Sequence, residues 1–364
     1  MRNTLLPLAM PGLSLFLRKR HGKAAFVFCL QGATLAVLLM AWRMGTFQVT
    51  ASSLYGKVGL AIIGFALLCA RLGSVWSAWK PEGDRYGESY WTMVGRRFGR
   101  DAKSHTGGGV LLVLAFVALL VPFVTSDPLW MDFSATLQAP SSTHVFGTDM
   151  YGRDIFSRIV HGSRISLGIG LAATALNMLL GTFLGVVSGY FGGLADAIIM
   201  RLLEILNSIP FLMLAILIMA VFGSSTGMLI LVLSVFALQP ARIIRSQILE
   251  LRGSDYIRAA EALGASQSRI ILRHVLPNAM SSLFVVATIR LGQNIISLAG
   301  LSFLGLGITP PTPSWGAMLQ EGRALILQAP WIGFFPGAAI FITVLSFNLL
   351  GDALRDALDP RLKI

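Results

Sequence analysis

Charged residues are scarce in this sequence. Only 13% of the 364 residues are charged, 55% are hydrophobic, and the mean hydropathy is +0.72. Soluble domains carry about a quarter charged residues, and one large core cannot explain a deficit of this size. The composition therefore excludes a soluble globule, and we expect the lipid bilayer to be the main solvent of the chain.

Cysteine is nearly absent as well, and the motifs of common enzyme active sites are missing. Cys29 and Cys69 lie in apolar stretches without CxxC or Cys/His spacing, so neither a disulfide nor a metal site is indicated. There is no GxxxxGKS or GxxxxGKT phosphate loop, no HExxH and no nucleophile elbow. We therefore expect this chain to be no enzyme, and to hold no metal and no cofactor.

Acidic residues are fewer than basic ones. The 17 Asp and Glu stand against 29 Lys and Arg, which gives a formal charge of +12. Nucleic-acid binding would need cations and aromatic residues gathered on one soluble module, and no such module is visible. Retention of cations in cytoplasmic loops explains the excess better, so we expect membrane lipid and no nucleic acid as a partner.

Apolar stretches near the length needed to cross a bilayer, about 20 residues, recur along the chain. The second and sixth candidates are the weakest, and no short-period repeat is present. The candidates cover approximately 24–42, 54–70, 109–124, 165–187, 205–222, 228–238, 281–303 and 332–350. These spans predict an all-α membrane protein with a six-helix core over 109–364, preceded by an extra N-terminal transmembrane hairpin within 1–108.

The distribution of cations predicts the orientation, because Lys and Arg near span ends are retained on the cytoplasmic side. Cations are dense before the first span, in the linker 71–108 and in the loop 239–278. In the loop 125–163, four aspartates offset Arg153 and Arg158. We therefore expect 239–278 and both termini in the cytoplasm, and 125–163 outside.

The cytoplasmic segment 254–278 is predicted to form a helix, a glycine turn and a second helix. Ser254 is a candidate N-cap, and Gly264 can take the left-handed position at the helix end. One face of the first helix follows the spacing i, i+3, i+4 and i+7 and consists of Tyr256, Ala259, Ala260 and Leu263. A partner protein could dock on this face; alternatively, the loop only covers the ends of its own bundle.

This segment resembles the cytoplasmic loop of permeases of binding-protein-dependent ABC importers, whose pattern is EAA, three residues, Gly, nine residues and Ile-x-Leu-Pro. Ala259, Ala260, Gly264, Leu276 and Pro277 match, whereas Arg258 and His274 depart from the pattern. The dipeptide, oligopeptide and nickel branch reads AA-x-ALGAS and then Arg-His-x-Leu-Pro-Asn, as here. The resemblance implies a coupling helix seated on a cytoplasmic ATPase. Its candidate residues are Tyr256, Ala259, Ala260, Glu261, Leu263, Gly264, Ala265, Arg269, His274 and Pro277.

A second informative segment lies in the predicted outside loop. Asp149 is a candidate helix cap, and Asp154 with Arg158 a candidate i, i+4 pair. A metal site of His144, Asp149, Asp154 and His161 is disfavoured, because their spacing fits no compact chelating motif. The stretch is similar to the FGTD-x-x-GRD-x-x-SR-x-x-x-G-x-R signature of the same branch, which implies a role against the extracytoplasmic binding protein. The signature residues singled out are Gly147, Thr148, Asp149, Gly152, Arg153 and Asp154.

Arg290 lies near the middle of its predicted span, with Gln293 and Asn294 at i+3 and i+4. Ionisable residues inside a span are costly and are functional candidates by default. The three residues could line a translocation path in which Arg290 meets a peptide carboxylate. Alternatively, Arg290 is a structural residue satisfied by neighbouring helices.

The resemblance covers roughly residue 109 to the C-terminus, including 301–316 and 348–361. It implies the permease subunit of an ATP-driven importer of dipeptides or oligopeptides in the bacterial inner membrane. The implied partners are a second homologous permease chain, two cytoplasmic ABC ATPase subunits that bind ATP and Mg, and a periplasmic or lipid-anchored binding protein. Import of nickel or another small solute by the same machinery is the alternative.

Two other classes of function fit the sequence less well. A secondary transporter or channel would need ion-coupling carboxylates or discontinuous helices at the midplane, and the core spans hold almost no carboxylates. A membrane scaffold would leave the match of the cytoplasmic loop unexplained.

Overall fold

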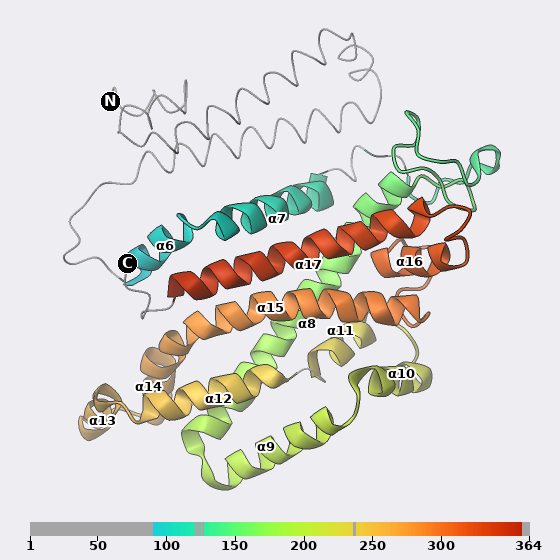
Figure 1. Ribbon diagram of the computed structural model, residues 1–364. Coiled ribbons are helices and arrows are strands. Elements are labelled where there is room, and N and C mark those ends of the chain that lie inside the picture. Colours follow the sequence, from blue (N-terminus) through green and yellow to red (C-terminus); the bar gives the residue numbers. More distant parts are fainter. Residues whose placement is uncertain (1–89, 121–124, 126, 236–237, 359–364) are drawn as a thin grey trace, which may run out of the picture. The chain divides into compact units, whose positions relative to one another are not determined.

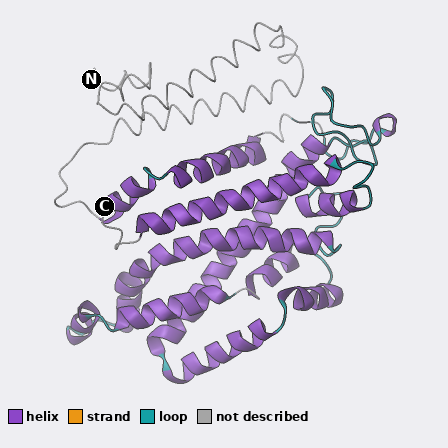
Figure 2. Ribbon diagram, viewed as in Figure 1, coloured by secondary structure: helices purple, strands orange, loops and turns teal. Residues whose placement is uncertain are grey.

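The computed structural model describes residues 90–120, 125, 127–235 and 238–358. These residues are mainly helical, and none of them belongs to a β-strand; Thr148 and Asp154 form an isolated bridge (Figure 2). The predicted all-α class is thereby confirmed. The predicted N-terminal hairpin lies outside the described residues, and the division at residue 108 stays a prediction. The chain divides into two compact units, and the described residues of 94–114 and 127–358 belong to the second.

The described helices are labelled in Figure 1. In chain order they are α6 Tyr90–Phe98, α7 Ala102–Leu120, the 3-10 turn η2 Phe133–Ala135, α8 Ile155–Phe191, α9 Gly193–Ser208, α10 Phe211–Phe222, α11 Thr226–Val235, α12 Gln239–Arg252, α13 Asp255–Ala262, α14 Gln267–Ile270, the π-helical η3 Ile271–Val275, α15 Leu276–Phe303, α16 Trp315–Arg323 and α17 Trp331–Leu358.

Four helical runs among these residues are long and apolar enough to cross a membrane, namely Ile155–Phe191, Thr226–Arg252, Gln267–Phe303 and Trp331–Leu358. The pair α9 and α10 adds a fifth if it is counted as one bent span, and α7 is a shorter apolar helix. At 37 residues, α8 extends over roughly 55 Å, whereas a bilayer core is about 30 Å thick. The helix therefore continues well beyond the predicted span 165–187.

The predicted continuous helix over 205–222 is wrong. The α9 helix ends at Ser208, α10 begins at Phe211, and the two axes meet at 87°. Pro210 lies at the break and has no backbone N–H to donate, and its ring holds the preceding Ile209 in an extended conformation (φ −96°, ψ 129°). The proline was visible in the sequence and is the physical reason for the bend.

Close contact between α8 and α12 organises the bundle. A Cβ on Gly181 would lie 2.9 Å from the Pro240 Cβ, and a Cβ on Gly185 would lie 2.7 Å from the Ala241 carbonyl oxygen. In lipid, helices associate through packing rather than through the hydrophobic effect, so small residues at such an interface let the backbones approach. Between them these contacts hold α12 along the second half of α8.

The two ends of this unit are named here after two residues. The Asp149 end carries the loop 127–154, α16 and the start of α8. The Gly264 end carries α13, η3 and the end of α12 (Figure 1). Separate apolar clusters lie along the bundle, one around Ile169, Met219 and Leu233 and another around Ile248 and Ile257 near the Gly264 end.

Candidate functional site

The Gly264 loop, residues 253–275, has the predicted helix and glycine turn. The α13 helix ends in a Schellman motif: the amide of Ala265 donates to the Ala260 carbonyl (3.0 Å), and the amide of Gly264 donates to the Glu261 carbonyl (2.9 Å). Gly264 has φ +78°, the left-handed conformation that favours glycine. Ser254 precedes α13 as expected, but its hydroxyl donates to the Leu251 carbonyl (2.5 Å) and makes no side-chain cap bond.

The faces of α13 differ in exposure. Ile257 is fully buried, and Ala260 packs partly buried against the same apolar cluster. The other residues of the predicted face point outward: Ala259 and Tyr256 are exposed, and Leu263 is 88% exposed. Since an exposed leucine at the tip of an ordered helix stabilises nothing within the chain, this face is suited to an interaction.

The second helix of the loop does not stand alone. It starts at Gln267 as α14, passes through η3 and continues as α15 to Phe303. The widened turn of η3 precedes Pro277, whose ring would clash with the carbonyl of the residue four positions earlier in a regular α-helix. Arg269 and Pro277 are exposed and His274 is half-buried. Because α14, η3 and α15 follow one another without a break, the loop continues directly into a membrane span.

At the Asp149 end, four charged side chains form a buried network, the Asp149 cluster. Asp149 Oδ2 accepts from Arg153 Nε (2.7 Å) and Arg158 Nη1 (2.5 Å). Glu321 of α16 accepts from both amino groups of Arg158 (2.6 and 3.0 Å) and from Arg153 Nη2 (3.2 Å). Asp149 and both arginines are less than 5% exposed and Glu321 is 21% exposed, so two cations and two carboxylates balance one another in a largely buried site.

The predicted roles of the aspartates need correction. The Asp154–Arg158 ion pair is not formed; Asp154 instead caps α8 by accepting from the Ser157 amide (2.8 Å), and it faces His144 Nδ1 (3.1 Å). Asp149 is no helix cap, because it closes the turn before α8 by accepting from the Tyr151 amide (2.8 Å). Arg158 pairs instead with Asp149 and Glu321, and its side chain is 2% exposed.

The other signature residues shape the loop around the cluster. Gly147 (φ +77°) and Gly152 (φ +71°) are left-handed, and a Cβ on Gly152 would lie 1.7 Å from the Asp132 carbonyl oxygen. Thr148 donates through its hydroxyl to the Ala135 carbonyl (2.5 Å), and its own carbonyl accepts from Trp331 Nε1 (3.1 Å). All six predicted residues therefore meet at one place. Glu321 was missed, because it lies 163 positions from Arg158 and no local pattern marks it.

The three predicted residues of α15 divide between two environments. Arg290 is half-buried and donates through Nη2 to Gln239 Oε1 of α12. Gln293 is exposed. Asn294 is buried and donates to Thr174 Oγ1 of α8 (2.9 Å). Asn294 therefore joins α15 to α8 in the interior, and a role of the three residues in a translocation path stays a prediction.

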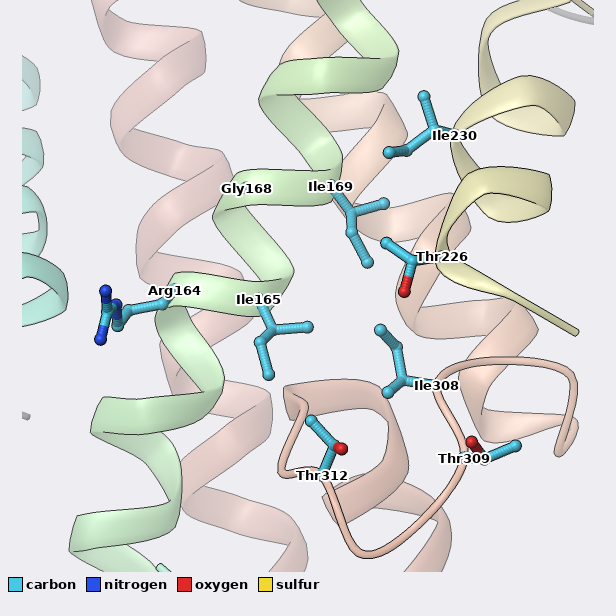
Figure 3. A pocket seen from close by; sticks show the side chains of 9 residues that line it. All are labelled: Arg164, Ile165, Gly168, Ile169, Thr226, Ile230, Ile308, Thr309 and Thr312. Carbon is cyan, nitrogen blue, oxygen red and sulfur yellow. The ribbon is translucent and has the colours of Figure 1, made fainter.

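A hollow of about 400 Å³ opens near the Asp149 end, between α8, α11 and the chain that follows α15 (Figure 3). Its walls are aliphatic with three hydroxyl groups, whereas Arg164 extends away from the space that the others share. The lining residues are Arg164, Ile165, Gly168, Ile169, Thr226, Ile230, Ile308, Thr309 and Thr312. Within the described ranges, no three His, Cys, Asp or Glu side chains gather so that they could hold a metal ion.

Comparison with known proteins gives consistent matches. A family model described as "Binding-protein-dependent transport system inner membrane component" matches residues 181–364. The glutathione transport system permease protein GsiD of Pectobacterium atrosepticum is 43% identical over 278 residues, which is 75% of this chain and 92% of that protein. GsiD of Escherichia coli is 44% identical over 276 residues, 75% of this chain and 91% of that protein.

Among solved structures, the inward-facing MetNI methionine ABC transporter matches with a TM-score of 0.46 and 22% identity. That match covers 56% of this chain and 98% of the other.

Proposed function

This chain belongs to the family of inner membrane components of binding-protein-dependent transport systems, and we propose that it moves short peptides into the cell. It is a multi-pass inner membrane protein and a transport subunit of an ABC importer. Glutathione is a tripeptide, and the permeases named for it share 43–44% identity with this chain. A short peptide with free carboxylates is therefore the leading substrate, ahead of nickel or another small solute.

The observation that carries the mechanism is the outward face of α13. A Schellman motif fixes the helix end, and the buried Ile257 anchors it, yet Leu263 and Tyr256 stay exposed. The chain has no phosphate loop of its own. In this proposal two cytoplasmic ATPase subunits bind ATP and Mg and hold α13 in a groove, so that their closure moves α12 and α15.

The orientation follows from the same proposal. The Gly264 end faces the cytoplasm together with both chain termini, because its arginines favour the cytoplasmic side. These arginines are Arg252, Arg258, Arg269 and Arg273. The Asp149 end then faces outward, where its rigid loop receives the loaded substrate-binding protein. A second, homologous permease chain supplies the other half of the pathway.

The experiment is co-purification of the complex in detergent with two matched variants. Leu263→Glu places a charge on α13, and Leu327→Glu places the same charge on a leucine that is 95% exposed outside the Gly264 loop. We expect the ATPases to remain with the wild type and with Leu327→Glu and to be lost from Leu263→Glu. Reconstituted vesicles should then take up a labelled tripeptide only when ATP is present.

Two results would overturn the proposal. If the ATPases stay bound to Leu263→Glu as firmly as to the control, α13 is not the coupling helix. If vesicles that retain the ATPases take up a nickel complex but no peptide, the substrate class is wrong while the assembly stands.

A further inference from the structure

Polar side chains follow the seam between α12 and α15. The two helices run antiparallel, and hydrogen bonds join them at successive levels from the middle of α15 to the Gly264 end. The bonded pairs are Arg290 with Gln239, Gln247 with Ser282, and Asn278 with Tyr256 of the adjoining α13. Arg290 lies roughly 20 Å along α15 from Phe303 and about as far from the start of that helix at Leu276, so it is near the middle of the helix.

The part of this seam around Arg290 and Gln239 cannot face lipid. Gln239 and Gln293 are exposed and Arg290 is only half-buried in the described part of the chain. Amide and guanidinium groups in contact with hydrocarbon are costly. By contrast, α10 has the sequence FLMLAILIMAVF, without a polar side chain, and most of its large residues are exposed. Lipid therefore suits α10, whereas the seam requires water or a polar partner.

We propose that Arg290 is a binding station for the free carboxylate of a peptide in transit, and that Gln239 covers it when no peptide is present. The inference rests on the proposed function. A guanidinium binds a carboxylate through paired, charge-assisted hydrogen bonds, whereas a neutral amide oxygen offers a weaker acceptor. A carboxylate that reaches this level therefore displaces Gln239.

The covering contact is built between the two elements that flank the Gly264 loop. The α12 helix, which carries Gln239, leads into α13, and α15, which carries Arg290, emerges from the loop through η3. A displacement of α13 is thus transmitted to both partners of the contact. Movement of α12 against α15 separates Gln239 from Arg290, so the station is uncovered at one stage of the transport cycle and covered at another.

The test uses the complete importer in proteoliposomes, with permease pair, ATPases and binding protein. The probes are labelled trialanine with a free C-terminal carboxylate and trialanine C-terminal amide, each at a concentration that saturates the binding protein. We expect Arg290→Gln to lower uptake of the free acid about tenfold relative to the amide, the loss expected for a charged hydrogen bond. Arg290→Lys should keep part of the preference, and the control Arg323→Gln, an exposed cation on α16, should keep all of it.

Variants of Gln239 test the covering contact. Gln239→Glu supplies an internal carboxylate that competes with the peptide, so uptake of the free acid should fall as in Arg290→Gln. Gln239→Ala leaves Arg290 without its cover and should retain the preference for the free acid over the amide. ATP hydrolysis stimulated by the loaded binding protein should stay near the wild-type rate in the control Arg323→Gln.

Three results would overturn the inference. An equal loss of both probes in Arg290→Gln would show a structural arginine, and unchanged uptake would show that no station exists. An unaffected Gln239→Glu would remove the covering role. If the wild-type complex hydrolyses ATP but imports neither probe, the proposed peptide substrate fails, and that result is distinguishable because it does not depend on any variant.

Discussion

At the Asp149 end, two arginines and Asp149 are buried and pair with one another and with Glu321, which is 21% exposed, whereas at the Gly264 end Tyr256, Ala259 and Leu263 of the α13 segment point outward. The Gly264 loop lies within residues 181–364, which the family model matches, whereas the Asp149 segment lies before them. The charged side chains of the Asp149 cluster contact one another, whereas Tyr256 and Leu263 are exposed in the part of the chain that the structure describes.

The Asp149 end is held together by contacts within the chain, whereas the outward face of α13 makes few such contacts. The Asp149 cluster ties the loop 127–154 to α16 through Glu321, so it can present a fixed surface before any partner arrives. The face of α13 offers little apolar contact to its own chain beyond Ile257 and its neighbours. Substitutions in the Asp149 cluster should therefore reduce the free energy of unfolding. Substitutions on the outward face of α13 should instead reduce the affinity for the proposed ATPase partners.

Removal of Arg158 should give the largest loss of stability. Arg158→Met leaves Asp149 and Glu321 with one arginine between them in a buried site, which typically costs about 3–5 kcal/mol. Arg201 provides the matched control, since it also pairs with a carboxylate, Glu204 (3.2 Å), but is 77% exposed. Arg201→Met should change the free energy of unfolding by less than about 1 kcal/mol.

The measurement is reversible unfolding of the purified chain in detergent, followed for both variants under the same conditions. Equal losses in Arg158→Met and Arg201→Met would mean that burial adds nothing to the cluster. The Asp149 end would then differ from the Gly264 end in the exposure of its side chains but not in what they contribute to stability.

Two glycines sharpen the comparison with a smaller effect. Gly152 and Gly264 have similar φ angles, +71° and +78°, but a Cβ on Gly152 would lie 1.7 Å from the Asp132 carbonyl oxygen, whereas nothing lies within 4 Å of one on Gly264. Both alanine variants carry left-handed strain of about 1 kcal/mol. Gly152→Ala must also displace backbone, so we expect a loss of about 3 kcal/mol against about 1 kcal/mol for Gly264→Ala.

Unfolding in detergent gives the global loss, and hydrogen exchange of the α13 amides shows whether Gly264→Ala acts locally. Similar losses in the two variants would mean that the loop 127–154 adapts easily, and the Asp149 end would then be less rigid than its contacts indicate.

Local features of the sequence predicted local structure well. The end of α13 at Gly264 was predictable because a glycine after a helical spacing marks a left-handed C-terminus. Pro210 lies at the break between α9 and α10, and the prediction of 205–222 rested on apolar character alone and took no account of it. In both places the decisive residue lies within a few positions of its effect.

Partners distant in the sequence were not predictable. The pairing of Asp154 with Arg158 was inferred from their spacing, but Arg158 lies against Glu321 instead, and Arg290 lies against Gln239. Spacing shows which side chains share a helix face, whereas it does not show which other helix packs on that face. The buried position of Asn294 depends in the same way on the packing of α15 against Thr174 of α8.

The smallest effect on stability is expected from Leu263, and it distinguishes the two faces of one helix. Leu263→Ala removes a side chain that is 88% exposed, so the free energy of unfolding should change by less than about 0.5 kcal/mol. Ile257→Ala, on the same helix, empties a fully buried position and should cost about 2–5 kcal/mol. Affinity for the ATPase pair should respond in a different way, because a truncated Leu263 loses its contact directly while the chain stays folded. A binding measurement that leaves Leu263→Ala at the wild-type affinity would contradict the docking role of this face. Because this variant is expected to be as stable as the wild type, unfolding could explain neither a lost nor an unchanged affinity.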